Sequence, residues 1–492
     1  MKRFALILSL SLLFSFSSLG ADDREQELLK GFHNISSNTL LGYAQKLTSP
    51  EFGGRLTGTP EYRLTAQWVA DRLKEWGIRP GGEGGTYFQE FPAPYTSVDS
   101  AGSVVFLVKD GSGALKERPL LFPDEYFPGS NSASGKVEGE VVYVGFGITA
   151  PELKYDDYRG ITAKGKIVLV ESGSPYEKND PPGAAWAPYN GTRHKLENAL
   201  RHGAAGLLVL DKVGNPNTLY QPGFVYAHTT HELARQLLLP TGKDIQVLKE
   251  EIVKTLKPRS FSTSLKARIT ASTTRHPEGK GCNVVGLLEG SDPELKEEVL
   301  ILGGHLDHLG TIGTLFPGAL DNASGCVDIL GAAQALGTSP LPRKRSLLFL
   351  FFGGEESGLL GSTYYIQHPL FPLQKTKIFM NLDMVGNGTG LSLWGGLSYP
   401  KIEEIFRKAN DRYIHRPWRA SQNRPSYGRP RSDGAVFSRA GFPTIGVGAT
   451  DTVKPIYYHD PRDTWQELTP EIMEDVSRLL FLGLTEAANA DL

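Results

Sequence analysis

The residues best suited to chemistry begin at the end of an apolar run, where His305 and Asp307 stand two positions apart. Imidazole nitrogens and carboxylate oxygens are ligands that Zn²⁺ takes in catalytic sites. Five further acid or histidine residues follow along the chain, and these are Asp321, Glu355, Glu356, Asp383 and His459. Together they turn a weak pair into the pattern expected of a two-metal site for hydrolysis.

Each of these residues also has an ordinary structural explanation when it is taken alone. A single His305 is more often a hydrogen-bonded buried histidine than a metal ligand, and Asp321 could cap the helix that follows it. Glu355 and Glu356 could be a solvated charge pair. Asp383 could be a turn residue at the end of a strand, and His459 could begin a loop. Convergence of all of them on one place would favour the metal site.

The candidates mostly follow short apolar segments that predict buried strands. Such segments lie at 284–288, 299–302, 346–352, 378–382 and 444–447, with helical patterns between them. Strands buried on both faces and joined by helices indicate an α/β fold with a mostly parallel central sheet flanked by helices. Because ligands bind at the carboxyl ends of such strands, most candidate residues should meet at one edge of the sheet.

Several motifs of this chain resemble those of a known family. They are His305-x-Asp307, Gly318-Ala-Leu-Asp-Asn-Ala-Ser-Gly325, Gly354-Glu-Glu-Ser-Gly358, Asn381-Leu-Asp383 and Tyr458-His-x-Pro-x-Asp463. In order and spacing they look like the co-catalytic zinc peptidases, a group that includes secreted bacterial aminopeptidases, glutamate carboxypeptidase and the non-catalytic transferrin receptor. The resemblance is strong over 280–475 and weak over 35–110.

This resemblance implies two zinc ions bound by five side chains. One zinc would be bound by His305, Asp321 and Asp383. The other would share Asp321 and would also be bound by Glu356 and His459. Two nitrogen ligands with carboxylates otherwise suit zinc, and the shared carboxylate lowers the repulsion between two neighbouring dications.

The resemblance also implies roles for residues that do not bind metal. Glu355 would be the general base for a hydroxide that bridges the two zinc ions. Asp307 would accept a hydrogen bond from the far nitrogen of His305 and fix its tautomer. Tyr458 could polarise the substrate carbonyl, and His308 would be structural. The implied activity is removal of the first residue of peptides, as in an aminopeptidase.

Other functions stay open from the sequence. Gly434 stands where the family has a histidine that is not a metal ligand, so the substrate pocket could differ. A carboxypeptidase or dipeptidase on the same metals would need cations for a terminal carboxylate, and Arg424, Arg429 and Arg431 could supply them. A receptor-like binding protein is the third alternative, but the intact ligands and Glu355 argue against it.

The chain also predicts an inserted domain at 125–260, where strand-like and helical segments alternate with Pro- and Gly-rich connectors and no catalytic set converges. Tyr155-Asp-Asp-Tyr-Arg-Gly160 followed by Lys164-Gly-Lys-Ile-Val-Leu169 resembles a protease-associated domain. We therefore expect the peptidase domain in two parts, an N-terminal segment at 22–124 and the catalytic segment at 261–492.

The first residues predict export. Lys2 and Arg3 precede an apolar run at 4–16, and small or polar residues continue to Ala21, which is the layout of a signal peptide spanning 1–21. The run is too short for a membrane span, and no second long apolar stretch follows. The expected mature form is therefore periplasmic or secreted, without a membrane span.

Charge and cysteine content limit the partners further. The formal net charge is -2 over 492 residues, without a basic block, which argues against nucleic acid as a partner. Peptides are the substrates that the family resemblance implies. Cys282 and Cys326 are the only cysteines, so no disulfide framework holds the fold. They could pair with each other or remain two buried thiols.

Overall fold

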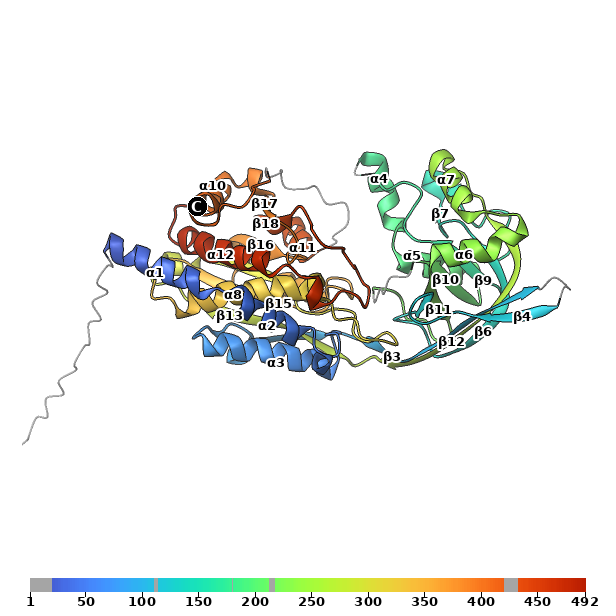
Figure 1. Cartoon of the computed structure of the whole chain (residues 1–492), viewed down its shortest axis with the longest axis horizontal. Coiled ribbons are helices and arrows are strands. Elements are labelled where there is room, and N and C mark those ends of the chain that lie inside the picture. Colours follow the sequence, from blue (N-terminus) through green and yellow to red (C-terminus); the bar gives the residue numbers. More distant parts are fainter. Residues whose placement is uncertain (1–19, 110–113, 179, 212–216, 420–431) are drawn as a thin grey trace, which may run out of the picture.

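The computed structural model describes residues 20–109, 114–178, 180–211, 217–419 and 432–492. They form two lobes side by side (Figure 1), each built on a sheet for which eight strands lie within the described residues. The main lobe comprises 20–92 and 280–492, and the insertion lobe comprises 95–276. The chain passes between the lobes on two connections, one after strand β2 (Phe88–Pro92) and one before strand β13 (Lys280–Leu288).

The sheet of the main lobe is parallel at its centre and antiparallel at both sides. Its order is β1-β13-β15-β14-β16-β18-β17, and β2 also pairs with β13. The parallel strands are β15 (Ser346–Phe352), β14 (Val299–His305), β16 (Thr376–Leu382) and β18 (Thr444–Thr450). The remaining strands, β1 (Arg79–Pro80), β2, β13 and β17 (Gly390–Trp394), join antiparallel. The α/β fold expected from the sequence is thus confirmed.

Helices cover both faces of this sheet because its central strands are apolar on both sides. Every residue of β14 and of β15 is buried. One face packs against α2 (Ser37–Leu47), α3 (Pro60–Glu75), α8 (Ser324–Thr338) and α12 (Pro470–Ala487). The other packs against α9 (Leu360–Gln367) and α11 (Asp433–Arg439). Helices α1 (Ala21–Asn34) and α10 (Pro400–Ala409) extend the first layer.

The insertion lobe has its own sheet, in the order β4-β3-β12-β6-β9-β10-β11-β5. Its strands are β3 (Tyr95–Lys109), β4 (Leu115–Pro119), β5 (Tyr126–Pro128), β6 (Gly135–Tyr143), β9 (Ile167–Glu171), β10 (Gly206–Leu210), β11 (Val225–Thr229) and β12 (Phe261–His276). Its helices are α4 (Pro181–Trp186), α5 (Thr192–Arg201), α6 (His231–Leu238) and α7 (Ile245–Thr255), and β7 (Thr149–Ala150) pairs with β8 (Tyr155–Asp156).

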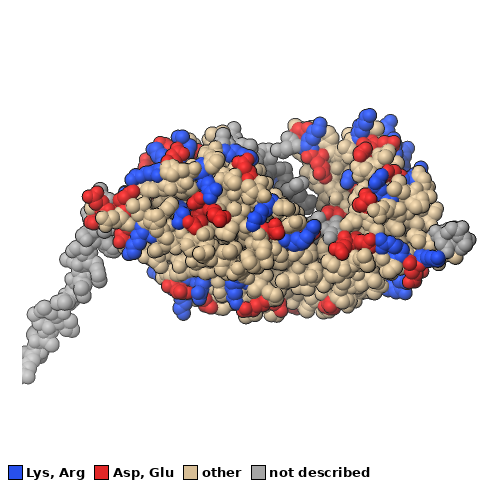
Figure 2. Space-filling model, viewed as in Figure 1, with Lys and Arg blue, Asp and Glu red and all other residues tan. Residues whose placement is uncertain are grey.

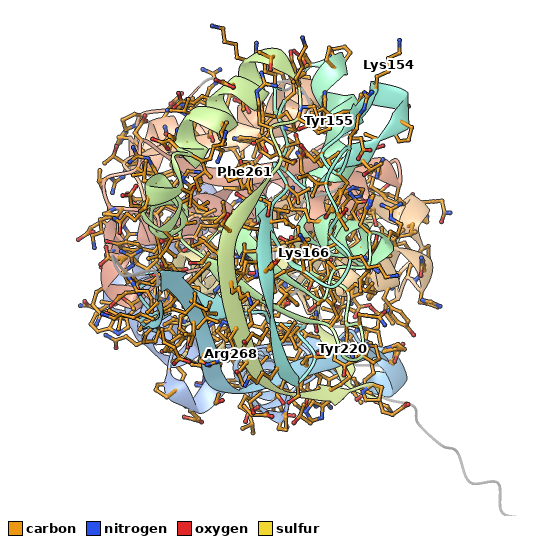
Figure 3. The ribbon with its side chains drawn as sticks, turned by 90° about the vertical axis from the view of Figure 1, so that its right-hand side faces the viewer. Lys154, Tyr155, Lys166, Tyr220, Phe261 and Arg268 are labelled. Atoms are coloured by element: carbon orange, nitrogen blue, oxygen red, sulfur yellow. The ribbon has the colours of Figure 1, made fainter. Side chains whose placement is uncertain are left out.

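The boundaries predicted for the insertion, 125 and 260, fall inside this sheet and need correction. Strands β3, β4 and β12, which the sequence assigned to the flanking peptidase segments, pair with the insertion. In β12 buried and exposed residues alternate, as in a strand with one face on a core. On its exposed face Arg268 (Figure 3) bonds Glu138 and Glu117 at 2.7 and 2.8 Å, joining three strands.

An apolar cluster joins the two lobes. Phe127 of β5 packs against Phe316 of the main lobe, with ring centroids 5.2 Å apart, and Leu309 and Ile312 complete the cluster. Figure 2 shows the surface hollowed between the two lobes, and on the face that it presents both signs of charge are interspersed.

The expected signal peptide, 1–21, lies almost entirely outside the described residues, and within them no helix is long and apolar enough to cross a membrane. Cys282 and Cys326 are both buried and free, so they do not form the disulfide that the sequence left open.

Candidate metal centre

The candidate ligands come together at the carboxyl ends of the parallel strands, as expected. His305 is the last residue of β14, Glu356 lies in the turn after β15, and Asp383 follows β16 directly. Asp321 lies in the turn Ala319–Ala323 that leads into α8, so it does not cap that helix. His459 comes from the connection between β18 and α12.

The side chains form two groups that share one residue. His305, Asp321 and Asp383 form one group, and His308, Asp321, Glu356 and His459 form the other; within each group the possible ligand atoms lie within 4.8 Å of one another. Only Asp321 belongs to both. This is the arrangement that a carboxylate bridging two metal ions requires.

The two oxygens of Asp321 face different groups. Oδ1 lies 3.3 Å from Nε2 of His305, which is also 3.5 Å from Oδ1 of Asp383. Oδ2 lies 3.2 Å from Nε2 of His459, which is 2.9 Å from Oε2 of Glu356. Each histidine therefore points one ring nitrogen at two carboxylates, as a ligand to a metal between them would.

The charges of these buried groups fit dications. Burial lowers the pKa of His305, but contacts with Asp321 and Asp383 outweigh burial and raise this pKa well above its ordinary value. Burial also lowers the pKa of His459, but its contacts with Glu356 and Asp321 outweigh burial and raise this pKa well above its ordinary value. The carboxylates thus demand more positive charge than neutral imidazoles supply. Buried charges of this kind are normally paired or bind metals.

Glu355 lies beside the ligands but outside both groups. Burial, and the neighbouring carboxylates of Glu356 and Asp433, raise the pKa of Glu355 well above its usual range, while His305 lowers it. A carboxyl group with a raised pKa beside candidate metal ligands is suited to accept and return a proton.

The contact expected between His305 and the Asp307 carboxylate is not a hydrogen bond in the structure. Nδ1 of His305 lies 3.1 Å from the main-chain oxygen of Asp307, whereas the carboxylate Oδ1 is 3.7 Å away. The buried carboxylate instead accepts a hydrogen bond of 3.1 Å from the amide of Glu355. Asp307 therefore fixes the turn that carries Glu355, and the peptide carbonyl orients His305.

His308, which the sequence assigned to structure alone, belongs to the second group. Its Nδ1 lies 2.8 Å from Oε1 of Glu356, the oxygen opposite to the one that faces His459. Since an ionised carboxylate only accepts hydrogen bonds, His308 donates here and orients Glu356.

Tyr458 lies at the rim, about half exposed, with its ring stacked on His459 at a centroid distance of 3.8 Å. Burial of its hydroxyl near Glu356 and Asp321 raises its pKa, so the phenol stays protonated and can donate a hydrogen bond. Arg424, Arg429 and Arg431, the cations considered for a carboxypeptidase, lie outside the described residues.

Asn322 is a buried residue that links three ligand segments. Its side-chain nitrogen donates to the carbonyl of Leu382 at 2.9 Å and lies 3.4 Å from that of His305. Its side-chain oxygen accepts from the amides of Gly325 and Met384, both at 3.1 Å. In the sequence, only its place directly after Asp321 points to this role.

The insertion lobe reaches the same region. Asp211 follows β10, and its pKa is raised to about 6 by burial, against the lowering effect of His459 and two lysines. A Cβ placed on Gly358, two residues after Glu356, would lie 3.1 Å from Oδ1 of Asn217. The insertion therefore forms one side of the surroundings of the candidate metal centre.

Comparison with known proteins identifies the domain that carries this site. Residues 283–482 match the model of Peptidase family M28. This part of the chain is an M28 peptidase domain. The match includes every candidate ligand and Glu355, and it leaves the insertion lobe and helices α1 to α3 outside.

Named relatives of the M28 domain include aminopeptidases. The chain is 26% identical over 223 residues to Aminopeptidase YwaD of Bacillus subtilis, a match that spans 42% of this chain and only 45% of that protein. It is 23% identical over 443 residues to the Probable lipoprotein aminopeptidase LpqL of Mycobacterium tuberculosis, spanning 86% of this chain and 75% of the relative.

The fold extends beyond the M28 domain in solved structures. The structure of a zinc aminopeptidase from Bacillus subtilis aligns with a TM-score of 0.62 over 92% of this chain and 95% of its own, at 20% identity. This likeness concerns the fold, and it includes both lobes.

Proposed function

We propose that this protein is a di-zinc exopeptidase, and specifically an aminopeptidase that removes N-terminal residues from peptides. The observation that carries the proposal is the division of the ligands into two groups that share Asp321, with Glu355 beside them. The names of the relatives, Aminopeptidase YwaD among them, support the same activity.

Zinc fits the donor atoms of these groups. His305 with Asp321 and Asp383 would hold one ion, and His459 with Glu356 would hold the second together with Asp321. Two zinc ions bound there would acidify a water molecule and polarise the carbonyl of the peptide.

The residues of the chain would manage the protons. Glu355 would take a proton from the attacking water and return it to the leaving amine, so the same group would act first as base and then as acid. Asp307 would keep Glu355 in place through the amide hydrogen bond. The hydroxyl of Tyr458 would donate a hydrogen bond to the oxygen on which negative charge develops.

We prefer an aminopeptidase to a carboxypeptidase because the named relatives are aminopeptidases. A carboxypeptidase needs a cation for the terminal carboxylate of its substrate. The arginines considered for that role, Arg424, Arg429 and Arg431, lie outside the described residues.

The test is hydrolysis of a free-amino peptide and its N-acetylated form, each with and without a chelator. An aminopeptidase cleaves only the free-amino peptide and stops when the metal is removed. Cleavage of the acetylated form at its carboxyl end would indicate a carboxypeptidase. Metal binding without hydrolysis of either peptide would indicate a receptor-like protein.

We further propose that the protein is exported and that the insertion lobe is a protease-associated domain. Support for export comes from Lys2, Arg3 and the apolar run after them, and support for the domain from the motif that begins at Tyr155. Fractionation of cells that express the full chain tests export, since activity confined to the cytoplasm contradicts it.

A further inference from the structure

Arg55 is a fully buried cation that has no carboxylate as an ion-pair partner among the described residues. Instead its guanidinium donates four hydrogen bonds, all to main-chain carbonyl groups. Nε donates to Leu306 at 2.9 Å, and Nη2 donates to Gly318 at 2.8 Å. Nη1 donates to Leu47 at 2.8 Å and to Pro317 at 2.7 Å. Burying a charge costs free energy, and an apolar side chain would fill this space at lower cost. A buried arginine here therefore indicates that its hydrogen bonds have a role.

Three of these carbonyls belong to the segments that carry metal ligands. Leu306 directly follows His305, and Pro317 and Gly318 directly precede the turn that contains Asp321. Arg55 therefore joins the end of β14 to the segment of the shared ligand. The two segments come from opposite ends of the connection 306–320, and the hydrogen bonds of Arg55 span it, as does the contact of Asn322 with the carbonyl of His305.

The loop around Arg55 is fitted to this position. The main-chain oxygen of Arg55 accepts a hydrogen bond of 3.2 Å from the amide of His308, and the amide of Gly310 donates to the carbonyl of Gly54 at 2.9 Å. Gly54 has a φ of +72°, and a Cβ there would lie 2.3 Å from the carbonyl oxygen of Gly310. Only glycine allows this approach.

Asp463 holds the same segment through its amide groups. Its Oδ1 accepts from the amide of Leu320 at 2.8 Å, and its Oδ2 accepts from the amide of Asp321 at 3.1 Å. The stretch 317–321 is thus bound at its carbonyls by a buried cation and at its amides by a buried anion. Together these contacts set where the carboxylate of Asp321 stands relative to His305.

We propose that Arg55 is a positioning residue for the two-metal centre, which sets the distance between the first ligand, His305, and the shared ligand, Asp321. It touches neither metal nor substrate and acts through the peptide groups that it binds. For its activity readout the proposal rests on the peptidase function proposed above. For its metal-binding readout it does not.

The experiment compares Arg55→Met with Arg345→Met in the full-length protein. Arg345 is also buried, and it donates to Glu298 at 2.7 Å at the opposite end of β15 from Glu355. Both variants lose a buried guanidinium in the same lobe. For each, zinc affinity is measured by competition with a chromogenic chelator, and folding is measured by circular dichroism.

We expect Arg55→Met to bind zinc about 10- to 100-fold more weakly than the wild type, the range seen when outer partners of metal ligands are removed. With saturating zinc, kcat should fall while KM changes little, because the substrate contacts stay in place. Arg345→Met should keep the zinc affinity of the wild type. Equal zinc affinity in the two variants would overturn the proposal.

Arg55→Lys covers the case in which Arg55→Met does not fold. Lysine keeps the charge but cannot donate in four directions at once, so zinc affinity should still fall at least severalfold. A folded lysine variant with wild-type affinity would reject the role. If the wild type binds zinc and cleaves no peptide, the proposed function fails, while the affinity comparison still decides the role of Arg55.

Discussion

The amide of Glu355 donates a hydrogen bond to Oδ1 of Asp307, and this 3.1 Å contact joins the ends of the neighbouring strands β14 and β15. This hydrogen bond holds Glu355, the proposed proton carrier, through its main-chain amide. Asp307→Asn should keep kcat within about threefold, since the amide oxygen still accepts this hydrogen bond. In Asp307→Ala, which removes the acceptor, kcat should fall about 10- to 100-fold. Steady-state kinetics with an aminoacyl anilide distinguishes this role from an effect of charge on His305, for which both variants would lose activity equally.

Glu355→Gln removes the proposed proton carrier and leaves the candidate metal ligands intact. We expect kcat to fall by roughly 10²- to 10⁴-fold, the usual contribution of general acid–base catalysis, with unchanged zinc content. Metal analysis together with kinetics measures both quantities. Ser357→Ala, in the same turn, serves as the control and should be close to the wild type. If Glu355→Gln kept nearly normal turnover, another group would have to carry the proton.

His308 is predicted to orient Glu356 without being required as a ligand. In His308→Asn the side-chain nitrogen can stand close to the position of Nδ1 and still donate to Oε1 of Glu356. We expect this variant to bind two zinc ions, and His308→Ala to bind two with about 10- to 100-fold lower affinity. His459→Ala should lose one ion. A stoichiometry of one zinc in His308→Ala would instead make His308 a ligand.

His228 predicts a loss of stability in acid that originates in the insertion lobe. It is buried, and burial lowers its pKa to about 4, although a contact with the carbonyl of Asp211 opposes this. In the unfolded chain the pKa is about 6.5, so between these values the unfolded state binds more protons. Stability is therefore full above pH 6.5 and falls by up to about 3 kcal/mol as the pH drops towards 4.

Urea denaturation of the wild type and of His228→Asn at several pH values tests this. The variant should lose this part of the pH dependence, since asparagine does not titrate in this range. His33→Asn, at an exposed position on α1, is the control. An unchanged pH dependence in His228→Asn would show that other groups cause the loss in acid.

The five predicted ligands were accessible to sequence reasoning because each is an acid or a histidine close to an apolar strand or at the start of a helix. The sheet then brings them together, since parallel strands present their carboxyl ends at one edge. The roles of Asp307 and His308 were not accessible in the same way. Their partners depend on which atom of a residue some 48 positions away lies within hydrogen-bond distance.

The role of Arg55 and the limits of the insertion also depend on tertiary contacts that the sequence does not reveal. Arg55 stands in a loop of glycines and prolines, and its partners are peptide carbonyls, which have no signature in the sequence. Strand β12 has a clear alternating pattern, but this pattern says only that one face is buried and not which sheet the strand joins. Strand pairing across more than 150 residues decides that.

The contact of Phe127 with Phe316 limits how this protein can be engineered. A version with residues 95–276 replaced by a short linker would leave Leu309, Ile312 and Phe316 without their covering, immediately after His308. The insertion is therefore not a detachable accessory that can be exchanged among peptidases at will. Any chimera has to carry a matching apolar surface, or the segment 309–316, between His308 and Asp321, loses its support.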